Sequence, residues 1–287
     1  MSKDEIRLRV GNRVLAMRFK PARYTAVFRD YFAQPYGSDT PDLVLDFKIV
    51  RRRTAPGVEN SLFNSKVLTD RGFRMGQGLV EGRFNRNTHI GKIRMDRELT
   101  VVPTIRVFEQ LLYQAFYSAE SSAGRNAILI HSSAVSRSGS GYLFVGRPES
   151  GKSTIADLSL PNTVFNDEIN LLYLSGEKIL VGSTPFNGLY KDKSEGCCDL
   201  KAVFLLKKGR SHKLTRPSGA EAVRSIMQEI VPPIGLDEVV TQDVRAGMLE
   251  LASGIQRRVP VYRLEFRKDR GFWQLIDQEL NRKRGSL

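Results

Sequence analysis

Alternating apolar and polar residues dominate the first hundred positions of the chain. The apolar residues from Ile6 to Val10 are separated by arginines, and the pair Gly11-Asn12 that follows is typical of a two-residue hairpin. Val14 to Phe19 can return as the partner strand, and the same alternation recurs from Leu43 to Ile49. Further strand-like pieces are Phe73 to Met75, Leu79 to Phe84 and Ile90 to Met95. The pattern predicts a β-rich N-terminal module over residues 1–102, which carries no catalytic constellation and is expected to recognise a partner or to pack on the second half.

Helical spacing replaces this alternation after Pro103. Thr104 can serve as an N-cap, and Gly124 is a natural stop. The apolar positions between them are Ile105, Phe108, Leu111, Leu112, Ala115, Phe116 and Ala119. We therefore predict a helix within residues 103–125 that joins the two parts of the chain, with its apolar stripe in a core rather than in a binding site.

The second part, residues 126–287, begins with another hairpin pattern. The apolar run from Ala127 to His131 leads into the turn Ser138 to Gly141, and Tyr142 to Val145 returns into a glycine-rich loop. This predicts an antiparallel neighbour for the strand that carries the loop. Later elements are expected at Gly219 to Ile230 and Thr241 to Ala252 (helices), Tyr262 to Phe266 (strand) and a last helix capped by Asp269. The fold class expected is α/β with a mixed sheet.

Composition narrows the class of protein. The 287 residues are 41% hydrophobic and 26% charged, which is ordinary for a globular chain. No apolar run approaches the roughly 18 residues that a membrane-spanning helix needs, and the first ten residues are charged, unlike a secretory signal. We therefore expect a cytoplasmic protein that does not bind membranes. The adjacent Cys197 and Cys198 and the three histidines do not form a zinc-binding pattern, so the cysteines are expected to be reduced residues of a strand or loop.

Net charge bears on the partners. The chain carries 45 basic and 31 acidic residues, a net charge of +14, which favours acidic partners. The basic residues are spread along the chain, with runs only at Arg51 to Arg53 and Arg282 to Arg284. Nucleic-acid binding would need a clustered patch, ideally with aromatic residues for stacking, so nucleic acid is not the expected partner. The sequence leaves the oligomeric state open, a homo-oligomer included.

The glycine-rich loop carries the most specific signal. Gly146 to Thr154, GRPESGKST, contains the phosphate-binding pattern of a glycine, four residues and then Gly-Lys-Ser. In that pattern backbone N–H groups turn inward around an anion, Lys152 reaches the β- and γ-phosphates, and Ser153 ligates Mg²⁺. A strand before the loop and a helix after it favour this reading over a chance glycine turn. The expected nucleotide-binding residues are Gly146, Arg147, Glu149, Ser150, Gly151, Lys152, Ser153 and Thr154.

A pair of acids lies close to the loop in sequence. Asp167 and Glu168 follow the apolar strand Val164 to Asn166, 15 positions beyond Lys152. The later apolar strand, Ala202 to Leu206, instead runs into lysines and offers no carboxylate. This spacing suits a strand, the loop, one short helix and a second strand that ends in carboxylates beside the phosphates.

These features together resemble the HPr kinase/phosphorylase family and its relatives with a fold like that of ATP-dependent phosphoenolpyruvate carboxykinase. The resemblance covers roughly Ile128 to the C-terminus and leaves out the first hundred residues. Its carriers are His131 to Val135, Leu143 to Thr154, Phe165 to Glu168 and Thr184 to Gly188, with weaker matches at Leu200 to Leu206 and Val259 to Phe266.

The resemblance implies an ATP- and Mg²⁺-dependent kinase that transfers the γ-phosphate to a hydroxyl, above all a serine, of a peptide, protein or small molecule. The resemblance makes Asp167 the base that accepts the hydroxyl proton and Glu168 the acid on the metal side. The Mg²⁺ ligands that it implies are Ser153, Asp167 and Glu168. His131 matches a histidine near the catalytic acid, and the catalytic residues implied are Asp167, Lys152 and His131. The alternatives are an Asp167 that only caps the next turn and a His131 that is a core residue.

Two departures from the family pattern leave other functions open. Pro148 removes a backbone N–H from the loop, and Glu149 places a negative charge near an anionic ligand, which Arg147 offsets in part. Glu168 stands where the family usually has Asp. A non-catalytic nucleotide-binding module and a phosphorylase or hydrolase acting on a phosphorylated partner are therefore alternatives. The segment Thr184 to Gly188 is expected to be mobile. Lys191 or Lys193 can add positive charge at the site, and the alternative is that each lysine belongs to an ordinary solvated loop.

Overall fold

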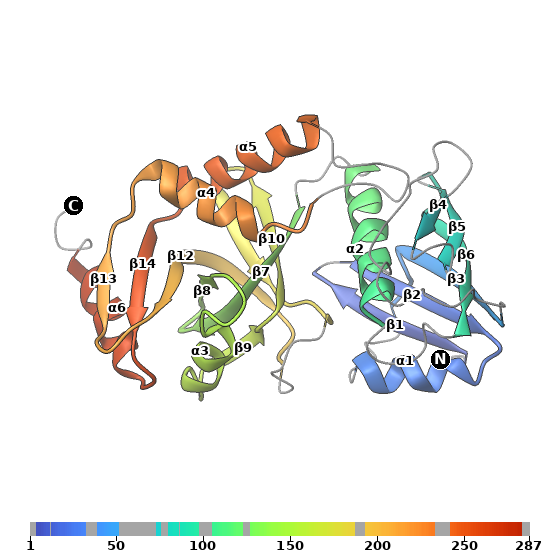
Figure 1. Ribbon diagram of the computed structural model, residues 1–287, viewed down its shortest axis with the longest axis horizontal. Helices are drawn as coiled ribbons and strands as arrows, with labels where there is room; N and C mark the ends of the chain where they lie inside the picture. The colour runs from blue at the N-terminus through green and yellow to red at the C-terminus, as the bar shows by residue number, and fades with distance from the viewer. Residues whose placement is uncertain are drawn as a thin grey trace, which may run out of the picture. The chain divides into compact units, whose positions relative to one another are not determined.

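The computed structural model describes residues 4–11, 13–32, 39–51, 73–75, 80–85, 87–97, 105–122, 127–186, 193–232 and 242–282. The chain divides into two compact units (Figure 1). The first unit consists of Met1–Ala127 with Pro232–Val244, and the second of Ile128–Val231 with Arg245–Leu287. No helix within the described ranges is both long and apolar enough to cross a membrane.

A six-stranded mixed sheet and two helices make up the described part of the first unit. The strand order is β1-β2-β3-β6-β5-β4, with parallel pairing of β2 with β3 and of β3 with β6. The elements are β1 (Glu5–Val10), β2 (Arg13–Lys20), α1 (Tyr24–Phe32), β3 (Leu43–Val50), β4 (Phe73–Met75), β5 (Val80–Asn85), β6 (Ile90–Asp96) and α2 (Ile105–Ser122). The strands expected from alternation are all present.

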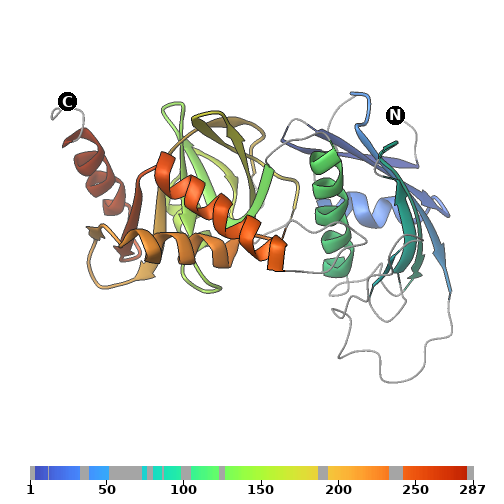
Figure 2. The same ribbon diagram turned by 90° about the horizontal axis from the view of Figure 1, so that it is seen from above.

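Both helices of the first unit pack on the same face of its sheet (Figure 2). Phe19 of β2 stacks on Phe28 of α1 with ring centroids 4.5 Å apart, and Phe47 of β3 lies 4.9 Å from Phe108 of α2. All four rings are nearly inaccessible to solvent. Since side chains alternate between the two faces of a strand, the apolar positions seen in the sequence form this aromatic core.

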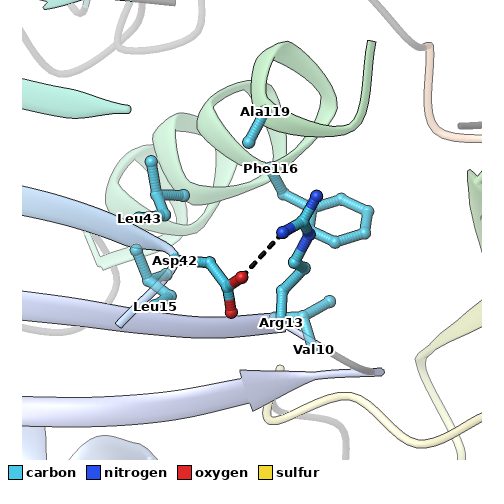
Figure 3. Close-up of a pocket in the computed structure, with 7 residues that line it drawn as sticks. All are labelled: Val10, Arg13, Leu15, Asp42, Leu43, Phe116 and Ala119. Carbon is cyan, nitrogen blue, oxygen red and sulfur yellow. Dashed lines mark hydrogen bonds and ion pairs between the residues drawn. The ribbon is translucent and has the colours of Figure 1, made fainter. Parts of the chain in front are cut away.

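A buried ion-pair network in the first unit is centred on Arg13. Arg13 bonds to Asp42 and to Glu120, each at 2.6 Å, beside a cavity of about 10 Å³ that is lined mainly by apolar side chains (Figure 3). A space of this size holds at most about one water molecule, so it is not a ligand site. Burial would lower the pKa of Arg13, but its bonds to the two carboxylates outweigh that effect and raise it.

The helices of the first unit add to what the sequence pattern predicts. The helix α1 lies within residues that the alternation predicts to be β-rich. The helix expected to join the two parts, α2, is present, and its apolar face packs on the sheet of the first unit. The expected cap Thr104, stop Gly124 and strand start Leu79 lie outside the described residues, as does most of each basic run.

The second unit contains an eight-stranded mixed sheet. Its order is β11-β10-β7-β8-β12-β14-β13; β9 pairs with β7, and β11 also pairs with β12, which closes five strands into a ring. The strands are β7 (Ala127–Arg137), β8 (Ser140–Val145), β9 (Thr163–Asn166), β10 (Ile169–Ser175), β11 (Lys178–Gly182), β12 (Cys197–Lys208), β13 (Lys213–Thr215) and β14 (Val261–Phe266). The helices are α3 (Lys152–Leu158), α4 (Gly219–Glu229), α5 (Gln242–Arg258) and α6 (Gly271–Arg282).

The strand pairing around β8 agrees with the expected hairpin. β7 pairs antiparallel with β8, so that Ser132 lies opposite Val145, and β12 pairs parallel with β8 on its other side. The chain is thus a mixed α/β protein with two mixed sheets. Asp269 accepts a hydrogen bond of 2.8 Å from the Gly271 N–H at the start of α6, as predicted. Cys197 and Cys198 are free thiols at the start of β12.

An aromatic core supports the strand that leads to the loop. Phe144 of β8 stacks on Phe204 of β12 at 5.1 Å and meets Trp273 of α6 edge-on at 5.8 Å. Ile155 and Ala156 of α3 belong to the same buried cluster. This packing fixes β8 and α3, and hence both ends of the loop between them.

Candidate functional site

The loop between β8 and α3 needs glycine at two positions. A Cβ atom on Gly146 would lie 2.6 Å from Ser150 Oγ, and one on Gly151 would lie 2.6 Å from the ring of Phe266. Gly151 also has a φ of +104°, which L side chains rarely adopt. The Ser150 N–H bonds to Arg147 O at 3.1 Å and closes a tight turn, and Ile155 N–H to Gly151 O at 2.9 Å begins the helix. The two glycines of the phosphate-binding pattern are therefore required by the shape of this loop.

The residues that depart from the family pattern lie at the exposed tip of the loop. Arg147, Pro148 and Glu149 are all exposed. Glu149 has a φ of +65°, an uncommon conformation for a residue with a side chain. The side chains of Arg147 and Glu149 are thus on the solvent side, and their predicted part in nucleotide binding stays a prediction.

Lys152 folds back over the loop that precedes it. Its Nζ donates to Gly146 O at 2.7 Å and to Arg147 O at 3.3 Å. Ser153 and Thr154, which follow it in α3, are half-buried. The ammonium therefore lies against the loop carbonyls, where phosphate oxygens of a bound nucleotide can replace them as acceptors.

The two acids lie in the turn between β9 and β10, which we call the acidic turn (Asp167 and Glu168). β8 and β9 both run antiparallel to β7, so their C-terminal ends reach the same edge of the sheet. Ser132 of β7 pairs with Val145 on one side, and its N–H donates to Glu168 O at 3.0 Å. The loop and the acidic turn are therefore about 10 Å apart, two strand spacings, at one level of the sheet.

Asn166 supports the acidic turn through hydrogen bonds. Its Oδ1 accepts the Glu168 N–H at 2.9 Å, while its Nδ2 donates to Phe186 O at 2.8 Å and to both oxygens of Thr184 at 3.1 Å. The residue is completely buried. Because this amide joins the turn to a segment 18 to 20 residues further on, its loss would free the turn on one side.

Asn170 makes the matching contacts on the other side of the turn. Its Nδ2 donates to Ser132 O at 2.8 Å, to Ser132 Oγ at 3.0 Å and to Asn166 O at 3.3 Å. Asn170 and Ser132 are fully buried. Neither asparagine is among the site residues predicted from the sequence. The sequence offered two signals. Asn166 ends an apolar strand directly before the acid pair, and Asn170 follows Asp167 by three residues.

The two acids have different environments. Asp167 is 1% exposed, whereas the side chain of Glu168 is 45% exposed. Glu168 Oε1 lies 3.7 Å from Nδ1 of His131, whose side chain is 41% exposed, so the two form an ion pair only when His131 is protonated. His131 therefore lies beside the acidic turn and is not a core residue. The structure brings Asp167, Glu168 and His131 to the edge where the loop begins.

The segment after β11 differs from the expectation of mobility. Thr184 is 1% exposed and Phe186 is fully buried, and both are held by Asn166. The Lys193 ammonium donates to Phe186 O. The described part of this segment is therefore a fixed support of the acidic turn, because its polar groups are bonded within the core. Asn187, Gly188 and Lys191 lie outside the described residues.

The donor groups at this edge fit a magnesium nucleotide. Mg²⁺ in such sites takes one or two carboxylates and relies on phosphate oxygens and waters for its other ligands. Ser153, Asp167 and Glu168 offer one hydroxyl and two carboxylates, while the described residues contain no group of three or more His, Cys, Asp or Glu side chains able to hold a metal by themselves. Within the described ranges nothing hydrogen-bonds to Ser150 Oγ, which is buried in the loop. The hydroxyl can therefore donate to a bound anion.

No protein-family model matches this sequence, and no curated protein is detectably similar to it.

Proposed function

We propose that this protein is an ATP-dependent kinase that transfers the γ-phosphate to a hydroxyl, above all a serine, of a peptide, protein or small molecule. The proposal extends the resemblance to the HPr kinase/phosphorylase family, which implies the same reaction. It places the chemistry at the edge of the second sheet where β8 and β9 end.

One observation carries the proposal. Ser132 pairs with Val145 at the start of the loop and bonds to Glu168 in the acidic turn. Phosphoryl transfer depends mainly on positioning and on neutralising charge, so a lysine, a magnesium ion and one carboxylate near the acceptor suffice in principle. A shared strand between loop and turn supports such positioning.

The chain's residues would divide the work as follows. Lys152 and the loop amides hold the phosphates, and Ser153 with Glu168 holds Mg²⁺, which when bound neutralises phosphate charge. Asp167 orients the acceptor hydroxyl and takes its proton, which requires an approach of about 3 Å. Asn166 and Asn170 position the acidic turn through buried hydrogen bonds. His131 lies beside Glu168 and can modulate the charge at the metal side.

A second function, a nucleotide-gated binding module without catalysis, is favoured by the tip of the loop. Pro148 lacks an N–H group, Glu149 is negative, and Lys152 already has two acceptors in the loop. Each of these features weakens the hold on phosphate. The third candidate, phosphorolysis or hydrolysis of a phosphorylated partner, uses the same groups in reverse.

The test combines nucleotide binding with transfer of label. The full-length protein is incubated with γ-labelled ATP, Mg²⁺ and a cell lysate, and labelled acceptors are identified by mass spectrometry. We expect label on a hydroxyl with the wild-type protein and at least about a hundredfold less with Asp167→Asn, which should still bind ATP in calorimetry. Asp157→Asn, the same change at an exposed residue of α3, is the matched control.

The other outcomes separate the candidates. ATP binding without any transfer of label supports the binding module. Release of label from a phosphorylated acceptor by orthophosphate supports phosphorolysis. Full activity of Asp167→Asn removes Asp167 from the proposed role.

A further inference from the structure

The face of the first sheet opposite α1 and α2 carries a concentration of basic side chains. Phe19 and Phe47 point to the helices, so the next residues along their strands, Lys20 and Lys48, point to the other face. We call five residues of this side the basic face: Lys20, Lys48, Arg83, Lys92 and Arg94. All five are exposed.

The strand register places like charges next to each other. Lys20 pairs with Lys48 between β2 and β3, and Lys48 pairs with Arg94 between β3 and β6. Because these strands are about 4.8 Å apart, three positive charges lie in one row across about 10 Å. In the neighbouring row Lys92 lies between Arg83 of β5 and Asp46 of β3. Like charges directly opposite each other destabilise a sheet, so this arrangement costs stability.

Compensation of these charges within the chain is incomplete. Arg94 has one distant carboxylate, Glu81, at 3.9 Å. Among the described residues, Lys20, Lys48 and Lys92 have no ion-pair partner. The basic residues of β1 differ in this respect, since Arg7 and Arg9 each bond to a neighbouring acid. Among the described residues, the row Lys20, Lys48 and Arg94 at the centre of the sheet thus carries charge that is only partly compensated.

We propose that the basic face binds an acidic segment of a protein partner, a peptide rich in carboxylates. Charge complementarity supports this occupant, because a row of three cations matches a few carboxylates of an extended chain. The inference concerns the first unit and does not depend on the proposed phosphoryl transfer.

The same residues argue against nucleic acid as the occupant. Proteins that bind duplexes through the backbone commonly engage about six to ten phosphates, a longer positive field than this one. Single strands need aromatic side chains for stacking, and the described aromatic residues of β2 and β3 point to the helices.

The test compares two triple variants of the full-length protein. The first, Lys20→Gln/Lys48→Gln/Arg94→Gln, neutralises the row on the basic face. The second, Lys213→Gln/Lys268→Gln/Arg270→Gln, removes the same charge from exposed residues of the second unit. The probes are a labelled decapeptide of alternating Glu and Ala and a labelled DNA duplex, followed by fluorescence anisotropy at about 20 mM salt.

We expect the first variant to bind the peptide at least about tenfold more weakly than the wild-type protein and the second to change binding by less than about threefold. Thermal melting checks that both variants fold. Three results would overturn the proposal: no peptide binding by the wild-type protein, an equal loss in both variants, or duplex binding that is tighter than peptide binding and is lost in the first variant. The last result would identify the face as a nucleic-acid surface.

Discussion

The two units bury polar groups in different ways. In the first unit, the buried acids Glu5 and Glu120 are each bonded to arginine. Burial would raise the pKa of Glu5, but hydrogen bonds from Arg18 and Arg7 outweigh that effect and lower it from 4.5. In the second unit, the buried polar residues around the acidic turn are neutral amides and hydroxyls, which bond mainly to backbone groups.

The buried acids of the first unit stabilise the fold, whereas the buried amides of the second unit position the residues of the candidate site. An acid bonded to arginine is neutralised and held in place by its partner, which suits a structural role. The neutral amides around the acidic turn hold its backbone without adding charge. We propose that the chemistry lies in the second unit, and the following predictions test that proposal in order of decreasing expected effect.

Lys152→Ala should reduce phosphoryl transfer by on the order of a thousandfold or more, the effect of removing an essential cation from such a site. The measurement is the transfer of label from γ-labelled ATP. Lys178→Ala, which removes an exposed lysine paired with Asp199, should keep the wild-type rate. Equal rates for the two variants would contradict a phosphate site at the loop.

Phe108→Ala should lower the stability of the first unit by about 3–5 kcal/mol, because it removes a ring at the centre of the aromatic core. Hydrogen exchange in β2 and β3 reports this loss. The chain has one tryptophan, Trp273, which lies in the second unit, so its fluorescence should report an unchanged transition there. Val27→Ala, at a 38% exposed residue of α1, is the control. Equal loss of both signals would contradict two separate cores.

Asn166→Ala should lower kcat by about 10–100-fold, the usual effect of losing a residue that orients a catalytic group, and leave the KM for ATP nearly unchanged. The acidic turn loses its support while the loop stays intact. Asn162→Ala, which removes one bond to Ser159, serves for comparison. A change in the KM for ATP alone would place Asn166 with nucleotide binding instead.

Asp269→Asn should have the smallest effect, and one that depends on pH. The Gly271 N–H, followed by His212 and Arg267, lowers the pKa of Asp269 from 3.8 to about 2. A lowered pKa contributes stability above the unfolded value of 3.8, and this contribution is lost as the pH falls toward about 2. The difference in melting temperature between wild type and variant should therefore shrink from pH 4 to pH 2. A constant difference would contradict the lowered pKa.

Local patterns predicted much of the fold and the elements of the site. Alternation and turn residues indicated the hairpin of β7 and β8, and the spacing between Lys152 and Asp167 indicated two strands ending at one edge. The helix α1 was not predicted because its buried apolar residues, Phe28 and Phe32, are only two and lie one helical turn apart.

The support of the acidic turn could not be predicted in the same way. Asn170 bonds to a residue 38 positions earlier, and Asn166 to residues 18 and 20 positions later. Sequence periodicity describes one element at a time and gives no information on such distant partners. The pairing of β11 with β12 could not be predicted for the same reason, because it depends on the curvature of the whole sheet and not on a local pattern.

A crystal structure with Mg²⁺ and a non-hydrolysable ATP analogue would test the central claim most directly. The account predicts that the triphosphate lies in the loop, with the Lys152 ammonium moved from Gly146 O to a phosphate oxygen and Mg²⁺ bound between Ser153 and the acidic turn. A nucleotide bound elsewhere, or a metal with no ligand from Asp167 or Glu168, would contradict it.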